Sequence, residues 1–182
     1  MMGFPRCART FMLCSLCIVW MPPLLPAEPI GGLEKIGGYR YVYRMLFKVY
    51  DVELHALQPS GAKALLSGEH PFELRFYYHR RIERSAFIRV ANRLLNKNLT
   101  SSELESIAAS VEALHAAYRS VKKGDRSVLR YIPGNGTTLS INDHERVTLT
   151  DPDARLYFKI WIGAQPISKT MREALLGRRP PS

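Results

Sequence analysis

Cysteine is almost absent from this sequence of 182 residues, and its three copies, Cys7, Cys14 and Cys17, all lie near the beginning. The rest of the sequence therefore has no disulfide framework and no cysteine to ligate a metal. The five histidines stand apart from one another, without the close spacing that metal ligands show, so we expect no metal site. A glycine-rich phosphate loop and a G-x-S-x-G nucleophile motif are also missing. We therefore expect no bound cofactor.

A hydrophobic run long enough to cross a bilayer is also lacking. Residues 11–25 are uncharged and mostly apolar, but they number only 15 and include two prolines, whereas a spanning helix needs about 20 residues. The run follows two arginines and ends close to Ala27, an arrangement typical of a secretory signal peptide. We therefore expect residues 1–27 to be a signal peptide, with cleavage near Ala27, export to the periplasm or the medium, and a single mature domain over residues 28–182.

Acidic residues are in short supply, with 16 Asp and Glu against 26 Lys and Arg and a formal net charge of +10. Loss of residues 1–27 would remove two arginines, which leaves 24 basic residues (26 − 2) and a net charge of +8 (24 − 16). The densest basic stretch, residues 75–97, holds Arg75, Arg80, Arg81, Arg84, Arg89, Arg93 and Lys97. It is either a solvated helix face or a surface for an acidic partner or an anionic membrane. We expect no nucleic acid partner, because the protein is predicted to be exported.

The spacing of apolar residues predicts an α+β protein. Residues 72–78 alternate strictly, as a half-buried strand does, while residues 83–97 and 100–118 place apolar side chains at helical intervals. Thr100 and Glu103 form a capping-box pattern at the start of the second helix. Further strands are predicted over residues 39–57, 127–132, 137–141 and 146–150, and further helices over residues 151–163 and 168–177. Strands and helices in separate blocks indicate an antiparallel sheet with helices on one face.

Tyrosines and arginines alternate at the start of the first predicted strand. In an extended chain Tyr39, Tyr41 and Tyr43 face one way, while Arg40 and Arg44 face the other. If the arginines lie on the concave face of the sheet, their planar guanidinium groups would suit a carboxylate or phenolate ligand. If they lie on the solvent side, they are simply exposed. The pattern leaves both alternatives open.

Three segments carry a more specific pattern. They are residues 46–54 (LFKVYDVEL), residues 121–137 (VKKGD followed by YIPGNGT) and residues 160–168 (IWIGAQPIS). Taken together and in this order, they resemble the chalcone isomerase-like family, in particular its small exported bacterial members. The resemblance implies an open-faced β-sandwich, in which a curved antiparallel sheet carries helices packed on one face and a ligand cleft lies between the two layers.

The resemblance implies two kinds of activity. Plant members close a flavanone ring by intramolecular Michael addition, using an arginine, a threonine, a tyrosine-bound water, an asparagine and a second Thr or Ser, whereas non-catalytic members bind fatty acids. Strand matching puts the threonine position on Tyr50, and matching of the motif over Gly163–Ser168 puts the second Thr or Ser position on Ile160. Asn92 matches the asparagine, and Arg40 or Arg44 could supply the arginine. No tyrosine stands where the enzyme's tyrosine should lie, so most of the catalytic set is changed.

We therefore expect an exported chalcone isomerase-like protein that binds a small apolar or amphipathic anionic molecule, such as a fatty acid, without catalysis. One alternative is an isomerase or intramolecular lyase acting on an unsaturated ketone, with Arg40, Arg44, Tyr50 and Asn92 as catalytic candidates. Another is an interaction module for an acidic partner or membrane surface. The residues expected to bind the ligand are Arg40, Arg44, Tyr50, Phe76, Ile160 and Trp161. The last two would equally suit the apolar stripe of a core helix.

Overall fold

The computed structural model describes residues 32–43, 46–58 and 60–178. The predicted signal peptide, residues 1–27, and the candidate Arg44 lie outside the described residues. The described strands are β1 (Glu34–Tyr43), β2 (Phe47–Ala56), β3 (Phe72–Tyr78), β4 (Arg126–Ile132), β5 (Gly136–Ile141) and β6 (His144–Leu149). The described helices are α1 (Ala62–Leu66), α2 (Arg84–Asn98), α3 (Ser101–Ser106), α4 (Ala108–Ala117), the 3-10 helix η1 (Pro152–Phe158), α5 (Lys159–Ile162) and α6 (Lys169–Leu175).

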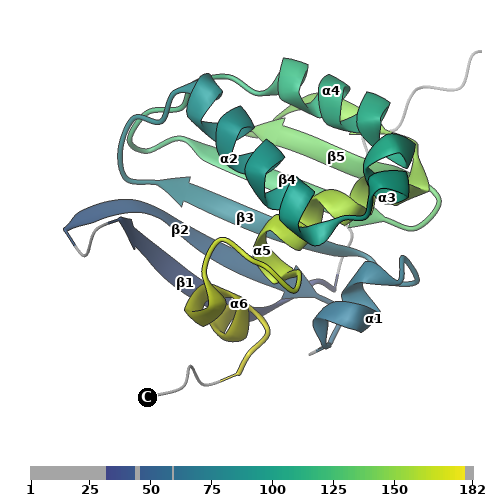
Figure 1. Ribbon diagram of the computed structural model, residues 1–182. Coiled ribbons are helices and arrows are strands. Elements are labelled where there is room, and N and C mark those ends of the chain that lie inside the picture. Colours follow the sequence, from purple (N-terminus) through teal and green to yellow (C-terminus); the bar gives the residue numbers. More distant parts are fainter. Residues whose placement is uncertain (1–31, 44–45, 59, 179–182) are drawn as a thin grey trace, which may run out of the picture.

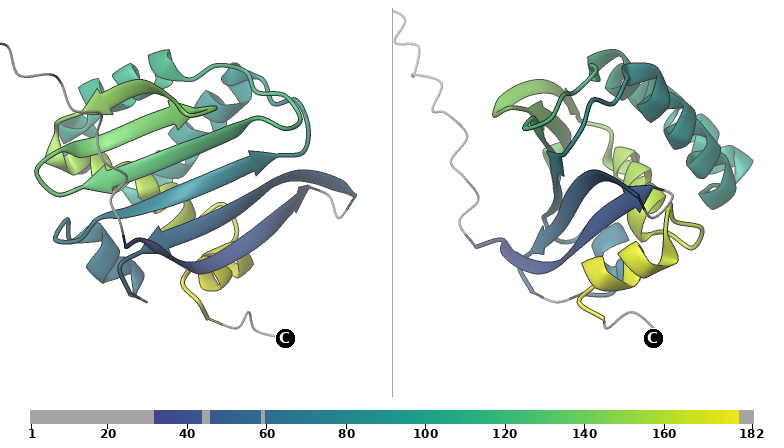
Figure 2. Two further views of the ribbon diagram at one scale, coloured as in Figure 1. Left: turned by 180° about the vertical axis from the view of Figure 1, so that it is seen from behind. Right: turned by 90° about the vertical axis from the view of Figure 1, so that its left-hand side faces the viewer.

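The strands form one antiparallel sheet in the order β1-β2-β3-β4-β5-β6, so each strand pairs with its neighbours in the sequence. Helices α2, α3, α4 and α5 lie over one face of the sheet (Figure 1). Seen from behind, the opposite face is uncovered by any described helix, and the side view shows that the sheet is curved (Figure 2). The predicted α+β architecture, a curved antiparallel sheet with helices packed on one face, is therefore confirmed.

The alternation of β3 sorts its side chains between the two faces of the sheet. Phe72, Leu74 and Phe76 are buried beneath the helices, and the Phe72 ring packs 4.6 Å from the Phe158 ring of η1. Burial of each such side chain stabilises the fold by roughly 1.5–3 kcal/mol. The other face is polar: Glu73, although completely buried, pairs there with Arg130 on the neighbouring strand β4, at 2.5 Å. Ion pairs between strands therefore take the place of a second apolar layer.

Strand β1 begins at Glu34, five residues before the predicted start at Tyr39, and so includes two glycines that strand propensity disfavours. The reason lies in helix α6, which packs against β1. A Cβ added to Gly37 would lie 2.0 Å from the carbonyl oxygen of Ala174 in that helix. Gly37 therefore lets the helix backbone approach the strand, a tertiary requirement that the local sequence does not reveal.

Two predicted helices differ from the structure. The helix expected over residues 100–118 begins with the capping box at Thr100, but it breaks at the buried Ile107 (φ −100°, ψ 5°) into α3 and α4. The segment expected to be one helix over residues 151–163 begins with Asp151 as N-cap, which accepts from the Asp153 N–H, but it is a 3-10 helix over Pro152–Phe158 followed by the short α5. Among the described residues, no helix is long and apolar enough to cross a bilayer.

Gly136→Ala is expected to destabilise the protein more than Gly134→Ala, although both glycines have positive φ angles (91° and 80°) at the β4–β5 turn. A Cβ at Gly136 would lie 1.9 Å from the carbonyl oxygen of Leu149, whereas a Cβ at Gly134 would meet nothing within 4 Å. Gly134→Ala should cost about 1–2 kcal/mol for the left-handed backbone alone, and Gly136→Ala clearly more. Urea unfolding measures both, and equal midpoints would contradict this close approach of the chain.

Candidate ligand-binding site

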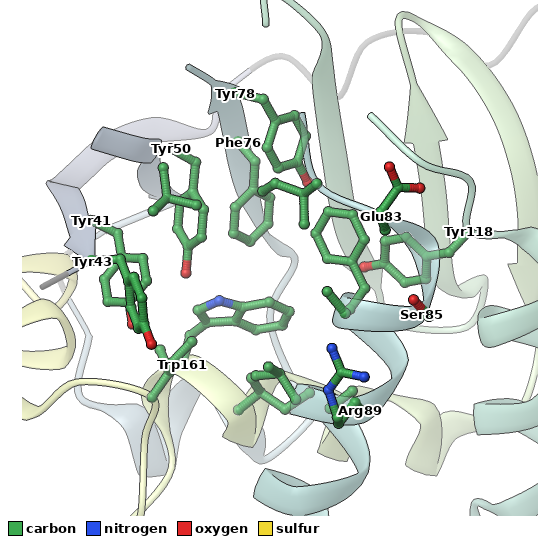
Figure 3. Close-up of a pocket in the computed structure, with 18 of the residues that line it drawn as sticks. Tyr41, Tyr43, Tyr50, Phe76, Tyr78, Glu83, Ser85, Arg89, Tyr118 and Trp161 are labelled. Carbon is green, nitrogen blue, oxygen red and sulfur yellow. The ribbon is translucent and has the colours of Figure 1, made fainter. Parts of the chain in front are cut away.

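A cavity of about 630 Å³ lies between the sheet and helices α2 and α5. Its floor consists of buried residues, which are Tyr50, Phe76, Tyr78, Ala91, Tyr118, Tyr157, Ile160 and Trp161. Its mouth consists of exposed residues, which are Tyr43, Arg80, Arg81, Glu83, Ser85, Arg89 and Arg93. Figure 3 shows Tyr41 and Tyr43 at one end, Glu83, Ser85 and Tyr118 at the other, and the Trp161 indole between them. The volume falls within the range of small-molecule sites, about 300–1,000 Å³.

Aromatic rings in mutual contact form most of the floor. The Phe76 ring lies 5.1 Å from the Trp161 ring and 5.5 Å from the Tyr50 ring, and the Tyr50 ring lies 5.3 Å from that of Tyr41. These tilted and edge-on arrangements are the ones that aromatic quadrupoles favour. Tyr50 on β2 and Phe76 on β3 reach the cavity because both occupy inward positions, where Tyr50 pairs with Tyr78 and Phe76 pairs with Val52, while Trp161 approaches from α5. The floor is therefore a rigid apolar surface with a few hydroxyl groups.

The floor hydroxyls stay protonated at neutral pH. Burial raises the pKa of the Tyr50 phenol far above its usual value, although a hydrogen bond with Trp161, toward which the hydroxyl points, opposes part of the shift (Figure 3). Burial likewise raises the pKa of Tyr78, Tyr118 and Tyr157. No carboxylate or basic side chain belongs to the floor. The floor thus presents neutral groups, which suit an uncharged, largely apolar part of a ligand.

The mouth carries four arginines and a single acid, Glu83. Glu83 pairs with Arg81 at 2.5 Å, and its other oxygen accepts from the Ser120 hydroxyl at 2.8 Å; together these bonds lower its pKa. Within the part of the chain that the structure describes, no carboxylate lies within ion-pair distance of Arg89 or Arg93. Arg93 also opposes the rise that burial causes in the pKa of Tyr41, since its charge lies close to that phenol. The mouth therefore holds positive charge that an anionic ligand could neutralise.

Four of the residues predicted to bind the ligand meet in this cavity. Tyr50 and Phe76 contribute from the sheet, and Ile160 and Trp161 contribute from α5. The structure thus brings together residues that lie more than 80 positions apart in the sequence. Their binding of a ligand remains a prediction.

Arg40 lies outside the cavity, on the opposite face of the sheet. Its Nε donates to Asp51 Oδ1 at 2.7 Å and its Nη2 donates to Oδ2 at 3.0 Å, which is a two-pronged pair. The reason is strand alternation: Tyr41 and Tyr43 face the cavity, so the residue between Tyr39 and Tyr41 must face away. Of the two alternatives that the sequence left open, Arg40 therefore takes the solvent side, and the expectation that it meets a ligand in the cleft is corrected.

Asn92 also lies away from the main cavity. It is exposed on α2 and lines a second hollow, of about 580 Å³, on the side of α2 that faces α4. Its neighbours there include His115, whose backbone carbonyl accepts from the Arg84 guanidinium at 2.8 Å. The structure therefore does not bring Asn92 together with Tyr50.

Sequence reasoning missed the arginines of the mouth. From the sequence, Arg89 and Arg93 belong to a basic stretch that is either a solvated helix face or a surface for an acidic partner or membrane, and neither alternative places them at the ligand cleft. In the structure the edge of that basic face borders the cavity, next to Val90. The spacing of Arg89, Val90 and Arg93 indicates that arginines lie beside an apolar row on this helix, and such a boundary can form the rim of a cleft. How far α2 stands from the sheet was not readable from that spacing.

A model of the chalcone isomerase-like family matches residues 36–177, which is most of the chain. The chain belongs to the chalcone isomerase-like family. A solved structure of a fatty-acid binding protein from Arabidopsis thaliana matches with a TM-score of 0.59 at 17% sequence identity, over 84% of this chain and 91% of that one. At this identity the likeness establishes a shared fold. A comparison with curated protein sequences found no match.

Two family-like segments have structural roles in this chalcone isomerase-like chain. In the segment IWIGAQPIS, Gln165 exchanges two backbone hydrogen bonds with the Asn98 side chain of α2, at 2.7 and 2.8 Å, which fixes α5 against α2. In the segment VKKGD, Asp125 accepts from the Lys122 N–H at 2.9 Å and from the Asn142 side chain at 3.0 Å. The first segment thus ties two helices of the helix layer together, and the second ties the chain before β4 to the turn between β5 and β6. Among the described residues, no group of three or more His, Cys, Asp or Glu could hold a metal.

Arg40→Gln is expected to raise the pKa of Asp51 toward its usual value, because the Arg40 guanidinium is the main group that lowers it. A lowered carboxyl pKa contributes stability above the unfolded-state pKa and loses it as the pH falls through the folded pKa. The variant should therefore be slightly less stable near neutral pH and match the parent protein in strong acid. NMR titration of the Asp51 carboxyl carbon measures the shift, and an unchanged pKa would contradict the pairing.

Proposed function

We propose that this chalcone isomerase-like protein binds an amphipathic anion, with a long-chain fatty acid as the expected ligand, and does not catalyse its conversion. The apolar chain occupies the cavity, and the negatively charged group lies at the mouth beside Arg89 and Arg93. The observation that carries the proposal is that apolar and charged residues occupy different parts of one cavity. Its floor is neutral and aromatic, and its mouth holds arginines without a paired carboxylate among the described residues. This polarity matches a molecule that is apolar along its length and charged at one end.

The burial of an alkyl chain supplies sufficient affinity. Each methylene moved from water contributes about 0.8 kcal/mol, and micromolar binding needs about 8 kcal/mol. Roughly ten buried methylenes therefore match this figure, before the cost of immobilising the ligand and the contribution of its charged group are counted. The Arabidopsis thaliana protein of the same fold is described as a fatty-acid binding protein, which supports the same class of ligand here.

Binding is favoured over isomerisation by the residues around the floor. Polarisation of an unsaturated ketone requires hydrogen-bond donors aimed at the oxygen where charge develops. Tyr50 does face the cavity, as that alternative requires, but Ile160 has no donor and Arg40 lies on the other face of the sheet. The raised pKa of Tyr50 also makes its phenolate scarce at neutral pH, so it is a poor general base.

We also propose that the protein is exported after removal of residues 1–27. The support is the uncharged apolar run after two arginines, with Ala27 at its end. The intact mass of the protein purified from the cells that make it should correspond to a chain beginning at Glu28. A mass that retains the first 27 residues would overturn the proposal.

Ligand binding is expected to change the fluorescence of Trp161, since its indole lies in the floor. In the chain that begins at Glu28, Trp161 is the single tryptophan. Its fluorescence should change on titration with a long-chain fatty acid and saturate at micromolar concentration. Arg89→Gln and Arg93→Gln should each weaken binding about three- to tenfold through loss of a charge-assisted contact at an exposed site. Lys97→Gln is the matched control, because it continues the same helical row but does not border the cavity.

The same titration with the corresponding fatty alcohol separates charge from shape. The alcohol lacks the carboxylate, so its affinity should be nearly equal in the parent protein and in the arginine variants. If Lys97→Gln weakens the acid as much as Arg89→Gln does, or if the alcohol shows the same losses, the arginines of the mouth do not hold the charged group.

Val90→Phe is expected to abolish binding, because its larger ring projects into the cavity and obstructs it. Val90 is half-buried on α2 and lines the cavity, so the larger ring has open space to enter. Val111→Phe, at a half-buried position on α4 that lines the second hollow, is the matched control and should leave binding unchanged. Circular dichroism confirms that both variants fold. Undiminished fatty acid binding by a folded Val90→Phe protein would place the ligand elsewhere.

A further inference from the structure

Large apolar side chains are exposed at the turn between β1 and β2. Leu46 is 79% exposed, Tyr43 is 50% exposed and Phe47 is 47% exposed. The fourth exposed large apolar residue within the described ranges is Leu57, at the far end of β2. Single exposed apolar residues need no explanation, but a cluster at one turn marks a surface that meets an apolar partner. We call Tyr43, Leu46 and Phe47 the hairpin tip.

The hairpin tip is continuous with the basic mouth of the cavity. The Arg80 guanidinium lies 5.2 Å from the centre of the Phe47 ring, in a cation–π contact. Tyr43 belongs to the hairpin tip and also lines the cavity. The end of β1, the start of β2 and the end of β3, from which the chain leads into Arg80 and Arg81, lie at the same end of the sheet (Figure 1). Apolar side chains, positive charge and the cavity opening therefore share one surface.

We propose that this surface, the hairpin tip together with Arg80, Arg81, Arg89 and Arg93, docks on a lipid bilayer that contains anionic lipids. Leucine and phenylalanine side chains gain free energy by entering the acyl region, and tyrosine suits the interface between acyl chains and headgroups. Arginines beside them bind the phosphate groups of anionic lipids. One protein surface thus matches both the headgroup region and the acyl region of the leaflet that it meets.

A second copy of the chain fits this surface less well. Two such surfaces facing each other would bring four arginines and one glutamate of one copy against the same set of the other. Like charges at close range oppose association, whereas an anionic bilayer neutralises them. The charge therefore favours lipid headgroups as the partner.

Docking would also place the cavity mouth at the headgroup layer, next to the acyl region that the hairpin tip enters. A water-insoluble ligand could then pass between bilayer and cavity without crossing bulk water. This consequence rests on the proposed function, because it requires that the cavity binds such a ligand. The docking itself does not, since neither Leu46 nor Phe47 lines the cavity.

Co-sedimentation with vesicles tests the docking. The chain that begins at Glu28 should bind vesicles of phosphatidylcholine with phosphatidylglycerol at least tenfold more tightly than vesicles of phosphatidylcholine alone. Binding should weaken as the salt concentration rises, because the screening length falls from about 10 Å at 0.1 M to about 3 Å at 1 M. Equal binding to both vesicles would overturn the role of the arginines.

Leu46→Ser should weaken binding to the anionic vesicles roughly tenfold, by the lost burial of one leucine side chain, and addition of Phe47→Ser should weaken it further. Leu57→Ser is the matched control, because Leu57 is exposed to the same degree as Phe47 but lies at the opposite end of β2. Arg80→Gln should weaken binding roughly fivefold, while the exposed Lys63→Gln in α1 should not. Equal losses in Leu46→Ser and Leu57→Ser would overturn the proposal.

Two further measurements separate this proposal from the proposed function. Leu46→Ser should bind a soluble short-chain acid, decanoate, as the parent protein does, by Trp161 fluorescence. Val90→Phe, with its cavity obstructed, should still bind anionic vesicles. If the parent protein binds decanoate but not anionic vesicles, docking alone is refuted. If it binds anionic vesicles but not decanoate, the cavity ligand alone is refuted. If Leu46→Ser instead shifts the oligomeric state in sedimentation, the surface is an interface between copies and the proposal fails.

Discussion

The contact between the Phe76 ring and the Trp161 indole, 5.1 Å between ring centres, is the point on which the site depends. Phe76 belongs to the sheet and Trp161 to the helix layer, so this pair joins the two layers while its bulk keeps them apart. Tyr157 extends the helix side of the contact, 6.1 Å from Trp161, and Tyr50 extends the sheet side. With large rings as spacers, the layers enclose a cavity beside the contact.

The two faces of the sheet differ in composition, and this difference makes the arrangement stable. The outer face carries cross-strand ion pairs, such as Arg40 with Asp51 and Arg130 with Glu73, and needs no covering layer. Inward-facing aromatic residues of the sheet line the cavity. Charge follows the same division, because the arginines beside the cavity stand at its mouth and not in its floor. The site is polar only where solvent, or a headgroup, can reach it.

Local patterns predicted much of the fold, since strict alternation over residues 72–78 and the capping box at Thr100 depend on neighbouring residues alone. Alternation also places Arg40 and Tyr41 on opposite faces of the sheet. It does not tell which of the two faces meets the helices. The placement of Gly37 in β1 and the arginines of the mouth depend on how helices approach the sheet. Such distances arise from packing between distant segments, and no spacing within one segment encodes them.

Native mass spectrometry of the protein purified from the cells that make it tests most directly whether the cavity holds an amphipathic anion. The parent protein is expected to carry an additional mass that dissociates on activation and identifies as a long-chain acid, while Val90→Phe prepared in the same way carries none. An identical added mass on both proteins would contradict binding in the cavity. A ligand without a negatively charged group would contradict the role assigned to the arginines at its mouth.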